Sequence, residues 1–170
     1  MLCQFTVKNF KSIRDEATFD MQAAAISEHE NRVIKDKDGE LFLPVSAIYG
    51  PNGGGKSNVL EALHSLSLKV LRPLYATSDN ENRMIPRKKL VIEPFAFSEK
   101  EKEEPTEFEV FFRTELAEYR YILHIKRDKV LYECLDRVKL DTKRRSALFE
   151  RDEEEVVLKG AFARLKISDE

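Results

Sequence analysis

The chain has 170 residues, 42% of them hydrophobic, so it can bury one core and has room for one domain with at most a small extra lobe. Its 29 basic and 31 acidic residues give a net charge of -2, which excludes a broadly basic nucleic-acid-binding protein but allows a local basic face. No apolar run approaches the ~20 residues that cross a bilayer. Residues 1–8 alternate apolar and polar side chains, unlike a signal peptide. We therefore expect a soluble, cytoplasmic protein.

The N-terminal residues predict two antiparallel strands joined through residues 9–14. Apolar side chains recur at every second position in both strands, at Cys3, Phe5 and Val7 and at Ala17, Phe19 and Met21. Residues 27–40 are polar, and Asp38-Gly39 is a turn signal. This polar stretch is expected to be either the tip of a hairpin or a mobile loop.

A strand, a glycine-rich loop and a helix are predicted next. Residues 45–49 are mostly apolar and predict a strand buried on both faces, beginning after Pro44. Residues 50–57 read GPNGGGKS, which fits the phosphate-binding pattern GxxxxGKS at every fixed position. Pro73 is expected to end the following helix. Its apolar stripe has spacings of three and four residues and comprises Val59, Leu60, Leu63, Leu66, Val70 and Leu71.

The residue types in this loop suit phosphate binding. Gly53, Gly54 and Gly55 lack a Cβ, so the backbone can reach positive φ angles and approach phosphate oxygens closely. Their N–H groups and the positive end of the helix dipole then point at the anion. Lys56 can reach the β- and γ-phosphates, and the Ser57 hydroxyl can ligate Mg²⁺. The alternative is a glycine-rich turn before an ordinary helix. We interpret the motif as a nucleoside triphosphate site.

The region after the helix begins with polar segments. Residues 77–89 predict a solvated loop, with a nucleic-acid or partner contact through its basic residues as the alternative. Residues 90–97 predict a strand edged by Pro94, and residues 98–105 predict a charged loop.

An antiparallel meander is predicted for the remainder of the chain. Alternating apolar residues mark strands over 107–112, 119–126 and 130–140, with turns near 116–118 and 127–128. Two shorter strands are expected around an acidic turn, over 147–150 and 156–158.

The cysteines and histidines give no sign of a metal site or a disulfide framework. Cys3 and Cys134 lack metal-type spacing and are expected to be reduced, partly buried thiols. His29, His64 and His124 form no ligand pair and are interpreted as structural residues. A GxSxG nucleophile motif is also absent from the sequence.

Two segments carry a resemblance to a known family. Residues 5–12, FTVKNFKS, followed by residues 50–63, GPNGGGKSNVLEAL, resemble the N-terminal lobe of ABC-type ATPases, in particular the SMC, RecF and OLD-like or abortive-infection proteins. Residues 105–110 and 119–121, with the segment 132–135, look most like the OLD-like group. The resemblance implies an α/β (α+β) fold, a P-loop NTPase half-domain with a mixed sheet around a Walker A helix and an antiparallel β lobe.

The resemblance also implies a domain layout and a set of binding residues. Residues 1–170 would form one ATPase lobe, in which 1–75 supply the N-terminal strands, P-loop and helix, and 90–165 supply the antiparallel β subdomain. ATP and Mg²⁺ would be the ligands, with Ser57 on the metal and Lys56 on the phosphates. Lys11 and Ser12 would lie near the base or ribose, although an exposed turn is the alternative for both. The residues implied to wrap the triphosphate are Asn52, Gly53, Gly54, Gly55, Lys56, Ser57 and Asn58.

Several catalytic parts of such ATPases are missing from this sequence. No apolar strand ending in Asp-Glu follows the P-loop, and the only glutamines, Gln4 and Gln22, precede it. In-line attack on the γ-phosphate needs a positioned water and a carboxylate. We therefore expect the chain to be an N-terminal segment of a longer ATPase, or a truncated chain, that binds ATP·Mg²⁺ and turns it over negligibly.

The function implied by the resemblance is ATP-controlled dimerisation in DNA processing or phage defence. Its partners would be a C-terminal ATPase half or a second subunit, with DNA or a nuclease as further partners. Two alternatives remain: a P-loop kinase or GTPase, and a non-catalytic module that uses nucleotide only to control an interaction. A kinase would need a lid of clustered arginines, for which Arg144-Arg145 is a weak candidate. A GTPase would need an Asn-Lys-x-Asp sequence, which the chain lacks.

Overall fold

A computed structural model of the protein describes residues 1–26, 28–76 and 91–164. The predicted polar loop over residues 77–89 and Leu90 lie outside the described residues. The described elements, in chain order, are β1 (Leu2–Lys8), β2 (Ala17–Asp20), η1 (Glu30–Arg32), β3 (Ile34–Lys35), β4 (Leu41–Phe42), α1 (Lys56–Ala76), α2 (Glu99–Glu103), β5 (Thr106–Arg113), β6 (Ala117–Lys126), β7 (Lys129–Lys139), β8 (Arg145–Asp152), β9 (Glu155–Leu158) and η2 (Phe162–Arg164).

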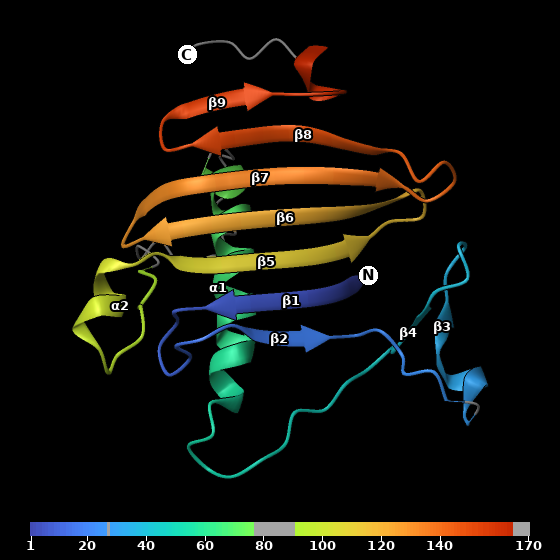
Figure 1. Cartoon of the computed structure of the whole chain (residues 1–170), viewed down its shortest axis with the longest axis horizontal. Helices are drawn as coiled ribbons and strands as arrows, with labels where there is room; N and C mark the ends of the chain where they lie inside the picture. The colour runs from blue at the N-terminus through green and yellow to red at the C-terminus, as the bar shows by residue number, and fades with distance from the viewer. Residues whose placement is uncertain (27, 77–90, 165–170) are drawn as a thin grey trace.

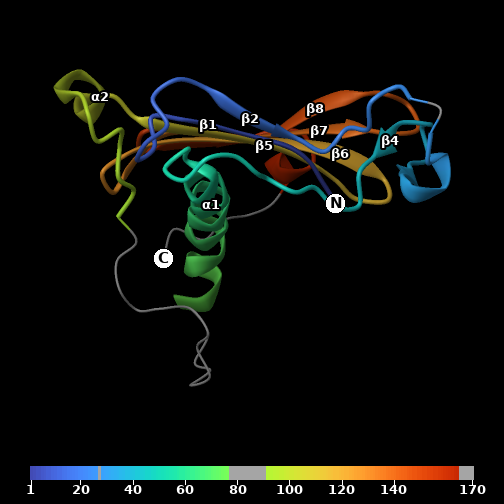
Figure 2. The same cartoon turned by 90° about the horizontal axis from the view of Figure 1, so that it is seen from below.

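Seven strands form one sheet, and helix α1 crosses a single face of it (Figures 1 and 2). The strand order is β2-β1-β5-β6-β7-β8-β9, and each neighbouring pair is antiparallel. The predicted meander over β5 to β9 is therefore confirmed. The turn expected near residues 116–118 lies slightly earlier, at residues 114–116, because Ala117 already pairs with Lys139.

The core lies between α1 and the covered face of the sheet. Period-two alternation places Phe5 and Val7 on this face, where both are fully buried. The Phe108 ring stacks on Phe5 and meets Phe10 edge-on, with ring centroids 6.4 Å and 6.1 Å apart. Helix α1 contributes Ala62 and Leu66 to the same cluster. Phe10, directly after β1, therefore belongs to the core.

The predicted strand over residues 45–49 is wrong. These residues form no strand, and Val45 and Tyr49 are 76% and 92% exposed. A strand needs backbone partners, and no described residue forms a backbone hydrogen bond with residues 44–49. The described sheet is consequently antiparallel throughout, without the parallel strands of the expected mixed sheet.

Three other expected boundaries also differ. Residues 91–97 are irregular, because only two backbone hydrogen bonds join them to Lys11. Residues 99–103 form helix α2 instead of a loop, and the Ser98 hydroxyl at its N-cap donates a hydrogen bond to the Glu101 carboxylate in the first turn. Helix α1 continues past Pro73 to Ala76, because a proline in the last turn removes only one helical hydrogen bond. None of the described helices is long and apolar enough to cross a membrane.

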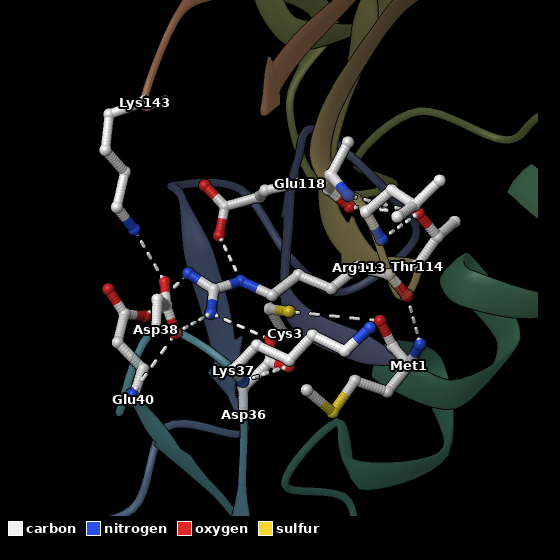
Figure 3. A network of polar contacts seen from close by, with 12 residues as sticks. Met1, Cys3, Asp36, Lys37, Asp38, Glu40, Arg113, Thr114, Glu118 and Lys143 are labelled. Carbon is white, nitrogen blue, oxygen red and sulfur yellow. Dashed lines mark hydrogen bonds and ion pairs between the residues drawn. The ribbon is translucent and has the colours of Figure 1, made fainter. Parts of the chain in front are cut away.

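A buried arginine fixes the β3–β4 hairpin to the end of the sheet (Figure 3). Arg113 of β5 is 6% exposed and its guanidinium lies 4.9 Å from the centre of the Phe42 ring. Four carboxylates surround it, on Asp36 (3.0 Å), Asp38 (3.0 Å), Glu40 (2.8 Å) and Glu118 (2.7 Å). The polar segment with its Asp38-Gly39 turn is therefore a hairpin tip, held by ion pairs.

Asp38 makes this network sensitive to acid. Hydrogen bonds from Lys143, the Glu40 backbone and Arg113 lower the pKa of Asp38 from 3.8 to about 2. A lowered pKa in the folded state stabilises the protein above the unfolded-state value, so this contribution is complete above about pH 4 and is lost as the pH falls towards 2. Its expected size is on the order of 2 kcal/mol.

Urea unfolding between pH 7 and pH 2 would measure the Asp38 contribution. Asp38→Asn is expected to lower the free energy of unfolding at neutral pH. As the pH falls, the free energy of unfolding of this variant is expected to decrease less steeply than that of the wild type. Asp141→Asn, at an exposed position of the neighbouring turn, serves as the control and is expected to follow the wild-type curve. Parallel acid profiles for wild type and Asp38→Asn would contradict this assignment.

The two cysteines and His124 lie within strands of the sheet. Cys3 and Cys134 are free and buried, and burial raises the pKa of the Cys3 thiol to about 11. Burial also lowers the pKa of His124, which lies in β6. Among the described residues, no group of His, Cys, Asp or Glu side chains is arranged to hold a metal ion.

Candidate functional site

The loop at residues 50–57 turns back on itself immediately before α1. Gly53 and Gly55 have φ angles of +81° and +82°, which side-chain-bearing residues adopt only at a cost. A Cβ on Gly54 would lie 3.1 Å from the Pro51 carbonyl oxygen, closer than a relaxed contact. All three glycines are therefore required by the backbone of this loop.

Unpaired amides in this loop form the anion-binding element. Among the described residues, the backbone N–H groups of Gly53, Gly55, Lys56 and Ser57 donate to no acceptor. The last two open α1, where the positive end of the helix dipole adds to the field of the N–H groups. Such an arrangement suits a phosphate group.

Lys56 lies across the loop. Its ammonium group donates hydrogen bonds to the carbonyls of Gly50 (2.9 Å) and Pro51 (2.7 Å), and it forms no ion pair with any described residue. The charge is therefore held over the loop by neutral acceptors and remains available to a phosphate. Ser57 follows on the first turn with an exposed side chain.

The turn between β1 and β2 lies against this loop. The Asn58 side-chain amide donates to the Ser12 hydroxyl at 2.6 Å, and a Cβ on Gly55 would lie 3.2 Å from the same oxygen. Two segments separated by some forty residues therefore meet at the phosphate-binding loop. The structure brings Ser12 to the loop.

Lys11 lies on the same turn but is occupied by acidic partners. It forms an ion pair with Glu61 of α1, and its ammonium group is 4.0 Å from the Glu93 carboxylate. Its φ of +52° places it in the left-handed region. Asn52 is exposed, and its side chain contacts no described residue through a hydrogen bond. Eight of the nine residues singled out from the sequence thus lie in the loop, directly follow it or contact it, whereas Lys11 lies beside Ser12 and pairs with α1.

Sequence reasoning missed Asn9, which holds the Lys11–Ser12 turn in place. Asn9 is 2% exposed and has a φ of +55°. Its side-chain amide donates to three backbone carbonyls around α2, those of Glu101 (2.7 Å), Glu104 (3.0 Å) and Pro105 (3.0 Å). Asparagine adopts the left-handed conformation more readily than most residues. Its position directly after a predicted strand could therefore have indicated a left-handed turn at Asn9.

Residues 45–166, more than half of the chain, match the family model described as "AAA domain, putative AbiEii toxin, Type IV TA system". The chain belongs to this family of P-loop ATPases. The match begins just before the loop and includes α1 and strands β5 to β9. No curated protein matches the chain.

The family assignment gives a P-loop NTPase fold and an ATP-binding function for this AAA domain. AAA ATPases generally bind ATP with Mg²⁺. The residues present fit such a ligand, because Gly53 and Gly55 turn the loop with positive φ angles and the amides of Gly53, Gly55, Lys56 and Ser57 are unpaired among the described residues.

Proposed function

We propose that the AAA domain binds ATP·Mg²⁺ at residues 50–58 and acts as one half of an SMC/RecF/OLD-like ATPase. The observation that supports this most strongly is the Lys56 ammonium group, held at 2.7–2.9 Å from loop carbonyls beside a set of unpaired amides. In this proposal ATP controls the pairing of two ATPase halves, in DNA processing or phage defence. In the same proposal, residues 1–170 act as one lobe, with residues 1–75 and 90–165 as its two parts.

Each loop residue has a proposed role. The amides of Gly53, Gly54 and Gly55 contact phosphate oxygens, and Lys56 neutralises charge on the β- and γ-phosphates. The Ser57 hydroxyl is a ligand of Mg²⁺, which supplies charge neutralisation at the phosphates when bound. Asn52 and Asn58 flank the triphosphate, and Ser12 with Lys11 lies towards the ribose or base.

Phosphoryl transfer to water needs a carboxylate or an equivalent group that positions the water. The acidic side chains described near the loop, Glu61 and Glu93, both lie beside Lys11 and are engaged by its charge. We therefore propose that the chain alone binds ATP but hydrolyses it negligibly. The catalytic carboxylate would come from the complementary ATPase half.

Exposed apolar side chains around the loop support a complementary half. Val45, Tyr49 and Leu60 are 76%, 92% and 58% exposed, and they border the loop and the first turns of α1. Large apolar side chains that are exposed beside the loop are available to an interface. The backbone groups of residues 45–49 form no hydrogen bond with any described residue, so they are available to a partner.

Lys56→Ala is expected to weaken ATP binding at least tenfold, which corresponds to about 1.4 kcal/mol or more. The substitution removes the positive charge over the loop and leaves the backbone unchanged. Calorimetric titration with ATP and with GTP, each with Mg²⁺, would measure the effect. Lys100→Ala, at an exposed position of α2, removes the same charge outside the loop and is expected to bind ATP as the wild type does.

Equal ATP affinities for wild type and Lys56→Ala would contradict the proposed site. A preference for GTP would contradict the assignment to ABC-type ATPases. Hydrolysis by the chain alone at the rate of complete ATPases would contradict the requirement for a second half.

A further inference from the structure

A second concave site lies on the part of the sheet farthest from the phosphate-binding loop. It has a volume of about 400 Å³ and is formed by the ends of β7 and β8 and by η2. Ser12 and the loop adjoin β1 and β2 at one edge of the sheet, whereas β8 and β9 lie at the other (Figure 1). The side chains that line it include four basic residues, Arg137, Lys139, Arg144 and Arg164.

These four basic side chains have no acidic partner among the described residues. Neighbouring cations are paired, since Arg145 contacts Asp136 at 2.6 Å and Lys143 contacts Asp38 at 2.8 Å. Positive charge therefore accumulates in the pocket. Asp141 lines an adjoining hollow that shares Arg137 and Lys139, but it forms no ion pair with either residue.

Arg137 carries an unsatisfied donor. Its Nε is buried and has no hydrogen-bond partner within the described structure. Unsatisfied buried donors are rare in folded proteins because each one costs free energy comparable to a lost hydrogen bond. Nε is out of contact with solvent, so an anion in the pocket would contact the rest of this half-buried side chain, which lines the pocket.

One wall of the pocket depends on a glycine. Gly160 has a φ of +52°, and a Cβ at this position would lie 2.8 Å from the Ala147 carbonyl oxygen. The adjacent Lys159 amide donates to the Leu148 carbonyl at 2.8 Å. This close approach packs the turn before η2 against β8 and brings Arg164 beside Arg144 at the pocket.

We propose that this pocket binds a phosphate-bearing anion. The planar donor fork of arginine matches phosphate oxygens in pairs, and three of the four cations are arginines. The pocket volume of about 400 Å³ suits a compact ligand. The phosphate could come from a free diphosphate or from a short single strand of nucleic acid.

The test uses the full chain with Lys56→Ala, so that phosphate binding at the P-loop does not interfere. Inorganic pyrophosphate and an eight-nucleotide single strand are titrated separately by calorimetry. Arg144→Ala and Arg164→Ala are each expected to weaken binding at least tenfold, and the matched Lys100→Ala change is expected to have no effect. Binding of pyrophosphate alone identifies a free diphosphate as the source, and binding of the strand alone identifies nucleic acid.

Arg137→Met provides a second measurement. It removes the orphaned donor while keeping much of the side-chain volume, so the melting temperature without ligand is expected to be unchanged or higher. Pyrophosphate is expected to raise the melting temperature of the parent chain but not that of Arg137→Met. Failure of both probes to bind, or equal binding by Arg144→Ala, Arg164→Ala and the parent, would overturn the proposal.

Discussion

Replacing Arg113 with alanine is expected to lower the free energy of unfolding by about 3–5 kcal/mol. The Arg113 side chain is 4% exposed, and its guanidinium contacts the carboxylates of Asp36, Asp38 and Glu118 at 2.7–3.0 Å. Without the guanidinium, these carboxylates would face one another. Asp38 would keep its ion pair with Lys143. Leaving buried carboxylates without a cation costs more free energy than losing an ion pair on the surface. The expected destabilisation is therefore large.

Chemical denaturation at pH 7 would measure the Arg113 effect. Arg120→Ala is the matched control, since Arg120 pairs with Glu109 on the adjoining strand but is 36% exposed, and a loss of about 1 kcal/mol or less is expected. Arg113→Lys keeps the positive charge but lacks the guanidinium that contacts several carboxylates. Its loss of unfolding free energy should therefore lie between those of Arg113→Ala and Arg120→Ala. Equal losses for Arg113→Ala and Arg120→Ala would show that the network contributes little.

The strands of the sheet were predictable because their signals are local. β5, β6 and β7 each alternate side chains over many residues and are joined by short turns, so the pattern that predicts a strand also indicates its neighbour. The apolar run at residues 45–49 carries an equally good strand pattern. It forms no strand because pairing depends on a partner, and no described strand lies beside it.

The contacts of the site and of the Arg113 network likewise include some that local sequence patterns predict and some that they do not. The glycine spacing and Lys56 predicted the loop directly, and the placement of Ser12 beside it came from the resemblance rather than from any local pattern. The Arg113 network joins residues more than seventy positions apart, and alternating acidic residues at 36, 38 and 40 give no indication of which cation they meet. Such long-range pairing follows only from the sheet topology.

The residue that connects the fold to the site is Asn9. Besides its three amide contacts, its side-chain oxygen accepts from the Phe95 amide at 2.8 Å, and its backbone carbonyl accepts from the Thr106 hydroxyl at 2.6 Å. These contacts join the β1–β2 turn, the segment before α2 and the start of β5. The turn that places Ser12 against the loop therefore depends on one buried amide.

Asn9→Ala is expected to lower the free energy of unfolding by about 2–4 kcal/mol, because several buried backbone groups lose their partner. Asn9→Gly separates the causes: it removes the same side chain but relieves the left-handed strain, so it should retain most of the loss and be about 1 kcal/mol more stable than Asn9→Ala. Thr106→Val removes a single hydrogen bond and should cost about 1 kcal/mol. Urea denaturation of the three variants would measure these differences. If Asn9→Gly were as stable as the wild type, strain at the turn and not hydrogen bonding would explain the asparagine, and the side-chain amide would have no structural role in presenting Ser12 to the nucleotide loop.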